Sequence, residues 1–311
     1  MKTSYSNMAF SKGSATTENT SFKRYIGVAT VNIAAVNPDA KTLAAVYDRQ
    51  EIGDEPSYLS NYEGVDTCRV SFIVKTNPDK CGGIVSTNRI QFSLRNEWRY
   101  NRDKTKVQVI DKYGRTAWLN VGTDIAFNPS NEKQFKVLGL PTYSNGQKPD
   151  ISMDCRPMYP GEEALEQFIA VYMNIPQCRK YVDGKWVGKS EAELAECECR
   201  LDHIESYFKG DFSEIKDIIS YQPNNAIKVL FGIKTAQDGK QYTDVYTRMF
   251  LSPRTFKYDR LEKDVNDAKA AGSYPMTEFE VCDIKEYVVD PSKVDMPDFT
   301  ATPEASKASW F

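Results

Sequence analysis

NRIQFSLRNEWRYNRDKTKVQVIDKYGRTAWL, residues 88–119, is the stretch that decides the fold class of this chain. Its first eight residues follow the two-residue period of a β-strand, with Ile90, Phe92 and Leu94 on one side and polar residues on the other. The runs KVQVI and TAWLNV then flank DKYGR, in which Gly114 supplies the positive φ that a hairpin loop needs. The stretch therefore predicts antiparallel strands with one apolar face.

Cations and aromatic residues interleave from Arg95 to Trp118, so this segment is locally basic in a chain whose formal net charge is −3. A groove for single-stranded nucleic acid needs this combination, because cations follow the phosphates and bases stack on flat side chains for about 1–3 kcal/mol each. The other interpretation is an exposed basic hairpin whose tryptophans belong to the core. The candidate nucleic-acid-binding residues are Arg89, Arg95, Trp98, Arg99, Tyr100, Arg102, Lys104, Lys106, Lys112, Tyr113, Arg115 and Trp118.

The rest of the chain also favours strands. Residues 25–36 form a nearly continuous apolar run, which is typical of a strand buried on both faces. Residues 65–75, VDTCRVSFIVK, alternate again and place Cys68, Val70, Phe72 and Val74 on one face. A second hairpin is predicted around Asp238-Gly239, within residues 226–250.

Helix patterns enter late in the sequence. Residues 160–176, PGEEALEQFIAVYMNIP, combine a helical apolar stripe with glutamates in the first turn and a closing proline. Capping boxes at Ser190 and Asp211 predict two further helix starts. Weaker patterns predict a short helix from Leu43, a strand at 135–140, a charged helix at 258–272 and a strand at 278–289.

This order of elements predicts a β-rich α+β fold, with roughly five to seven strands in a curled, mostly antiparallel sheet and helices inserted into it. An OB-type barrel core is consistent with the pattern, and such barrels bind oligonucleotides across one face. A β-sandwich with helical decoration explains the same alternation and needs no ligand.

Composition divides the chain into three parts. Residues 1–21, rich in Ser, Thr and Asn, predict a flexible N-terminal segment. Residues 22–289 predict a single OB-like nucleic-acid-binding domain with helical insertions at about 160–222. Residues 290–311 are acidic and lack apolar periodicity, so they predict a disordered tail.

The tail ends in Trp310-Phe311. An acidic, flexible segment with aromatic residues at its end suits a pocket on a partner protein, so Trp310 and Phe311 are candidate partner-binding residues. The alternative is a terminus of no consequence.

The chain has the composition of a soluble protein, and we expect a cytoplasmic location with no membrane contact. No apolar run approaches the roughly 20 residues that cross a bilayer, and the start lacks the apolar core of a secretion signal. The seven cysteines are odd in number and scattered, which agrees with a reducing compartment.

Signs of catalytic chemistry are few. His203 is the one histidine, and the phosphate-binding, nucleophile-elbow and dinucleotide motifs are missing from the sequence. Cys81 has no basic partner in sequence. Cys178, Cys197 and Cys199 together with His203 could bind zinc, but residues two apart in a helical pattern point away from each other, which favours buried thiols. We expect a non-enzymatic protein without metal or cofactor.

The runs at 88–119, 154–176 and 207–219, with the hairpin that follows, resemble the single-stranded DNA-binding proteins of crAss-like and other large tailed phages. The resemblance implies an OB-type core that coats replication and recombination intermediates in the host cytoplasm, without sequence specificity. It also implies a tail that contacts replication or recombination proteins. The mildly acidic tail and Lys307 near its end depart from that pattern.

Two other classes of function fit the same sequence. A phage structural or assembly protein would share the strands and the lack of catalytic motifs, and it predicts no salt-sensitive affinity for DNA. An enzyme with dispersed acidic residues predicts turnover that depends on a divalent metal.

Overall fold

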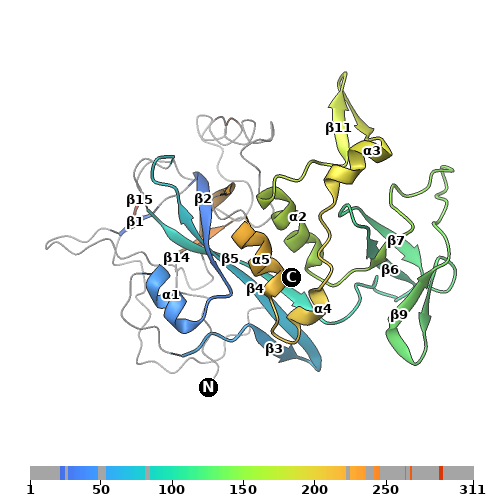
Figure 1. Cartoon of the computed structure of the whole chain (residues 1–311), viewed down its shortest axis with the longest axis horizontal. Helices are drawn as coiled ribbons and strands as arrows, with labels where there is room; N and C mark the ends of the chain where they lie inside the picture. Colours follow the sequence, from blue (N-terminus) through green and yellow to red (C-terminus); the bar gives the residue numbers. More distant parts are fainter. Residues whose placement is uncertain are drawn as a thin grey trace, which may run out of the picture.

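A computed structural model of the chain describes residues 22–24, 27–47, 54–80, 85–221, 225–235, 241–245, 263, 267 and 287–289. Its largest sheet is antiparallel and six-stranded, in the order β14-β13-β2-β4-β3, with β5 on the other edge of β4 (Figure 1). The strands are β2 (Gly27–Val36), β3 (Leu59–Tyr62), β4 (Val65–Thr76), β5 (Thr87–Arg95), β13 (Ala226–Thr235) and β14 (Gln241–Val245).

The alternation in β4 and β5 is confirmed. The side chains predicted to share one face of each strand are buried: Cys68, Val70, Phe72, Val74, Ile90, Phe92 and Leu94. They belong to one hydrophobic cluster with α2 (Glu162–Tyr172), where the Phe168 ring lies 4.5 Å from the Phe72 ring, centroid to centroid. On the other face of β4, Ile73 packs against Leu43 of α1 (Ala40–Val46). The sheet is therefore covered on both sides at its centre.

The predicted apolar stripe of α2 is also confirmed, because Leu165, Phe168, Ile169 and Tyr172 are all buried. Gly161 precedes the helix with φ +89, and a Cβ added there would lie 2.1 Å from the Ser93 carbonyl oxygen. Only glycine allows the helix to start this close to β5.

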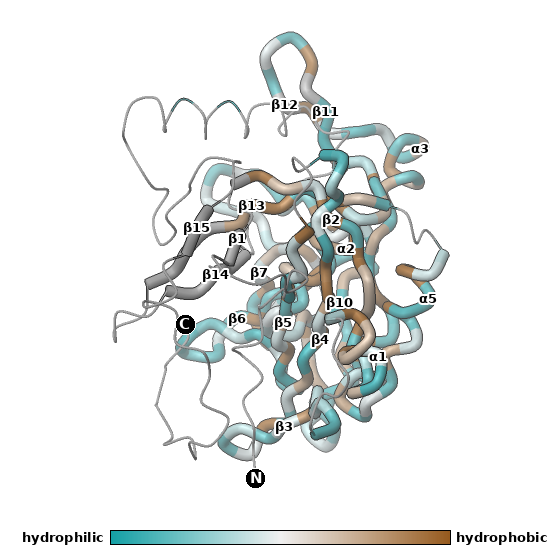
Figure 2. Tube along the Cα trace, turned by 90° about the vertical axis from the view of Figure 1, so that its left-hand side faces the viewer, coloured by the Kyte–Doolittle hydropathy of each residue, from teal (hydrophilic) through white to brown (hydrophobic). Residues whose placement is uncertain are grey.

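A second group of strands extends from this core, on the right of Figure 1. A three-stranded sheet has the order β10-β6-β7, and two hairpins, β8–β9 and β11–β12, follow in sequence. Buried residues of β6 and β7 belong to the same hydrophobic cluster as those of β2, β4 and β13. Figure 2 shows the hydrophobic segments toward the interior and hydrophilic segments along the outer turns. The strands are β6 (Lys106–Ile110), β7 (Thr116–Asn120), β8 (Ile125–Asn128), β9 (Asn131–Val137), β10 (Arg156–Pro157), β11 (Arg179–Val182) and β12 (Lys185–Gly188).

The remaining elements are short. Ser190 caps its helix with the predicted capping box, since its side chain accepts from the backbone of Glu193 while the Glu193 side chain accepts from Ser190 N. The elements are α3 (Glu191–Leu194), a 3-10 turn (Ala195–Cys197), α4 (Ile204–Tyr207), α5 (Ser213–Tyr221) and the pair β1 (Phe22–Arg24) with β15 (Tyr287–Val289).

The structure changes three details of the expected fold. In the part that the structure describes, the strand order does not return from β5 to β14, so no closed barrel is found. Residues 160–222 are not a purely helical insertion, because they contain the β11–β12 hairpin. The helix expected from Leu43 begins at Ala40, because Asp39 caps it by accepting a hydrogen bond from Thr42 N at 2.7 Å.

Several sequence predictions lie outside the described residues. They concern residues 1–21, Cys81, most of the helix expected at 258–272, and the tail with Trp310 and Phe311. Among the residues that are described, no helix is long and apolar enough to span a membrane.

Candidate nucleic-acid interface

The β6–β7 hairpin has one face in the core, and its other face is partly open, because Lys106 and Trp118 are exposed there while Gln108 and Ile110 are buried. Its register pairs Lys106 with Asn120 and Gln108 with Trp118, so these four residues share one face. The other face carries the buried residues Val107, Val109, Ala117 and Leu119. Trp118 keeps 37% of its surface exposed, so an aromatic ring lies on the outer face of the hairpin.

The turn that precedes β6 presents cations. Asn101 fixes the turn, because its Oδ1 accepts from Lys106 N at 2.8 Å. Lys104 has φ +56, a left-handed conformation that bends the chain outward. Arg102, Lys104 and Lys106 are all exposed, and within the described part of the chain none of them forms an ion pair. Their charge is therefore available to an anionic ligand.

Trp98 does not share this surface, contrary to the stacking role expected from the sequence. It is 7% exposed, and its Nε1 donates to the Glu132 carbonyl oxygen at 2.8 Å. Its ring lies 4.7 Å from the Tyr159 ring and 4.3 Å from Lys133 Nζ. Burial lowers the pKa of Lys133, whose ammonium also donates to Asn96 Oδ1 at 2.9 Å. Trp98 is a core residue in this structure, and a base cannot stack on it without local opening.

The two candidate tyrosines are half-buried. The Tyr100 ring packs edge-to-face against Phe127, with centroids 6.1 Å apart, and burial raises the pKa of its hydroxyl. The Tyr113 ring lies in the β6–β7 turn with Lys112 Nζ and the Arg115 guanidinium each 5.0 Å from its centroid. Tyr113 is therefore already in contact with cations of its own turn.

Four of the candidate cations have carboxylate partners. Arg95 pairs with Glu97 at 2.7 Å, Arg99 with Glu163 at 3.2 Å and Lys112 with Glu198 at 2.5 Å. Arg115 is the most enclosed, with 18% of its side chain exposed, and it contacts both Asp111 and Asp150 at 2.8 Å.

Arg115 has a structural role. The Asp111 carboxylate is fully buried and also accepts from the backbone N–H groups of Tyr113, Arg115 and Ser152, each at 3.0 Å. This pair closes the β6–β7 turn.

Arg89 lies elsewhere, on β5 opposite Ile73 in the main sheet. The structure thus brings together Arg102, Lys104, Lys106 and Trp118, with Arg99 beside them, because Gln108 N donates to the Arg99 carbonyl oxygen at 2.8 Å.

Sequence reasoning missed the β11–β12 hairpin. Residues 179–189, RKYVDGKWVGK, interleave cations and aromatics in the same way as residues 95–118, so the signal was present. The hairpin begins next to the β6–β7 turn, since Cys178 Sγ lies 3.4 Å from the Tyr113 carbonyl oxygen and Arg179 pairs with Asp150 at 3.2 Å.

The cysteines near this turn are partly or fully buried thiols. Burial raises the pKa of Cys178 to about 11 and that of Cys199 to about 12. His203 is exposed, and among the described residues no group of three His, Cys, Asp or Glu side chains is arranged to hold a metal ion. The zinc alternative therefore receives no support from the geometry.

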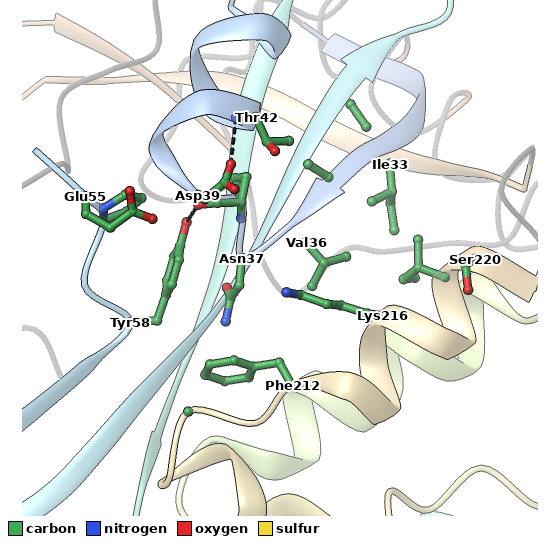
Figure 3. A pocket seen from close by; sticks show the side chains of 16 residues that line it. Ile33, Val36, Asn37, Asp39, Thr42, Glu55, Tyr58, Phe212, Lys216 and Ser220 are labelled. Atoms are coloured by element: carbon green, nitrogen blue, oxygen red, sulfur yellow. Dashed lines mark hydrogen bonds between the residues drawn. The ribbon is translucent and has the colours of Figure 1, made fainter. Parts of the chain in front are cut away.

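A cavity of about 580 Å³ lies away from this surface, between the end of β2, the start of α1 and α5 (Figure 3). Val36 and Phe212 line it, and Lys216 of α5 extends toward Val36 and Asn37. Because carboxylates outnumber cations among its labelled residues, the cavity does not favour a polyanion.

Comparison with protein-family models, with curated proteins and with solved structures finds no match for this chain.

Proposed function

We propose that this protein binds single-stranded DNA without sequence specificity on the outer face of the β6–β7 hairpin. The observation that carries the proposal is the exposed Trp118 ring on a face whose edge bears Arg102, Lys104 and Lys106, three exposed cations without ion pairs among the described residues. Bases stack on an aromatic ring whatever their identity, and cations hold the backbone.

The spacing on this face suits such a ligand. Trp118 and Asn120 are alternate residues of β7, roughly 7 Å apart along the strand, and Lys106 lies opposite Asn120. The ring and the cations are therefore neighbours rather than parts of separate surfaces. Duplex DNA offers phosphates to the cations but keeps its bases stacked, so it lacks the contact with Trp118.

Arg99 and Lys112 extend the surface, because each can exchange its carboxylate partner for a phosphate group of the ligand. Their partners Glu163 and Glu198 are 35% and 52% exposed, and exposed ion pairs contribute only about 0–1 kcal/mol. A phosphate group can therefore replace either carboxylate at small cost.

The fold supports this proposal with a curled sheet. Five strands follow one another as β14-β13-β2-β4-β5, and Cα atoms of β5 and β14 approach within 8 Å. This arrangement is typical of a partly open, five-stranded OB-type barrel, and we include that barrel in the proposal. From the resemblance of residues 88–119, 154–176 and 207–219 to single-stranded DNA-binding proteins of large tailed phages, we propose non-enzymatic coating of phage replication and recombination intermediates as its biological role.

The test is a fluorescence-anisotropy titration with oligothymidine at two salt concentrations, beside a duplex of equal length. We expect tighter binding of the single strand and an affinity that falls as salt rises. The double variant Arg102→Ala/Lys104→Ala should flatten the salt dependence, because fewer counterions are released.

The control is Lys41→Ala, which removes an exposed cation of α1, on the opposite side of Figure 1 from β6 and β7, and should leave the slope unchanged. Equal affinity for duplex and single strand would contradict the proposal. A complete lack of salt-dependent binding would instead favour a structural or assembly protein.

A further inference from the structure

We propose that the β11–β12 hairpin is a second arm that contacts the same single-stranded nucleic acid. This inference rests on the proposed function, because the arm extends the outer face of the β6–β7 hairpin with Trp118, called the Trp118 surface below. The hairpin stands away from the rest of the chain in Figure 1, and residues 182–185, 187 and 188 are exposed. Val182 and Val187 keep 42% and 39% of their surface exposed.

The hairpin carries the chemistry that a single strand needs. Residues 179–189 contain four cations and one carboxylate, so the segment is basic within an acidic chain. The register pairs Tyr181 with Trp186 next to the tip, and it places Lys180 and Lys185, which alternate with them along the strands, on the other face of the hairpin. Charge and aromatic content together favour a polyanion with exposed bases over a protein partner.

The shape of the hairpin is set before any ligand binds. Asp183 and Gly184 form its two-residue turn with φ +48 and φ +79, and two positive φ values define the turn that matches the twist of paired strands. A two-stranded hairpin is only marginally stable alone in water, so the exposed Val182 and Val187 gain from a partner.

The base of the hairpin is fixed to the Trp118 surface. The Asp150 carboxylate bridges the two parts, since it pairs with Arg115 of the β6–β7 turn at 2.8 Å and with Arg179 of β11 at 3.2 Å. Cys199 N, which follows the hairpin in sequence, donates to the Lys112 carbonyl oxygen at 3.0 Å. A strand that leaves Trp118 toward Lys112 and Tyr113 therefore arrives at the hairpin.

The cations of the hairpin are available to phosphates. Lys185 forms no ion pair within the described part of the chain. Lys180 pairs with Glu193 at 2.7 Å, but both side chains are more than 40% exposed, so this contact is weak and exchangeable.

The experiment compares two ligands, an oligothymidine of about 5 nucleotides and one of about 15, which bracket the site sizes of single OB-type domains. The variants are Tyr181→Ala/Trp186→Ala and Lys180→Ala/Lys185→Ala, with Lys41→Ala as the matched cation control. Each full-length variant is first checked by circular dichroism. We expect each hairpin variant to lose about tenfold or more in affinity for the longer ligand and to bind the shorter ligand as the parent does.

The outcomes separate the two proposals. If the parent protein binds neither ligand, the proposed function fails and the arm fails with it. If the parent binds both ligands and the hairpin variants bind the longer one as tightly, the proposed function stands and the arm is overturned. A hairpin that serves a protein partner would give this second result.

Discussion

Trp98 and Trp118 are 20 residues apart, but Trp98 is buried in the core and Trp118 is exposed. A pair of alanine variants tests whether the first stabilises the fold and the second binds a base. Trp98→Ala removes a buried ring that contacts Tyr159 and Lys133. Truncating a buried Trp typically costs about 3–5 kcal/mol of the free energy of unfolding, and the lost bond from Nε1 to the Glu132 carbonyl adds about 1 kcal/mol. Trp118 is 37% exposed and its removal should cost less than about 2 kcal/mol.

For the affinity for oligothymidine we expect the opposite order, with the larger loss in Trp118→Ala. Trp118→Ala removes one stacked base, worth about 1–3 kcal/mol, and should weaken binding about 5- to 150-fold. Trp98→Ala should change the affinity of the folded protein little, provided that binding is measured below its unfolding transition.

Two assays on each variant give the answer. Urea unfolding should show a midpoint lowered by about 1 M or more for Trp98→Ala and much less for Trp118→Ala. Anisotropy titrations at low salt then report affinity. If Trp98→Ala binds more weakly at unchanged stability while Trp118→Ala binds normally, Trp98 is the stacking surface and our assignment of core and surface is wrong.

Two further predictions concern stability. Gly161→Ala should lower the urea midpoint far more than Gly64→Ala, because both have positive φ but only at Gly161 does a Cβ meet a backbone atom, the Ser93 oxygen at 2.1 Å. Equal losses would show that φ strain alone decides. Burial raises the pKa of Glu166, and the charge of Glu162 raises it further. The folded state therefore holds a proton that the unfolded chain releases. The free energy of unfolding should fall as pH rises above the usual carboxyl range. Glu166→Gln should flatten this decline in urea midpoints measured above the usual carboxyl range, and an unchanged pH dependence would remove Glu166 as its source.

Local patterns in the sequence were enough for the elements that depend on periodicity. The inward face of β5, the stripe of α2 and the capping box at Ser190 were all predicted, because each depends on residues two to four positions apart. The antiparallel, β-rich character of the fold follows from the same patterns.

The strand order and the surface were decided only by tertiary structure. The sequence of residues 95–118 does not show that Lys133, from β9, and Tyr159 cover Trp98. It also does not show that Asp150 holds Arg115 in an ion pair. Whether an aromatic ring or a cation in a hairpin remains available to a ligand depends on which distant segments pack against it, and those contacts form between residues that share no local period.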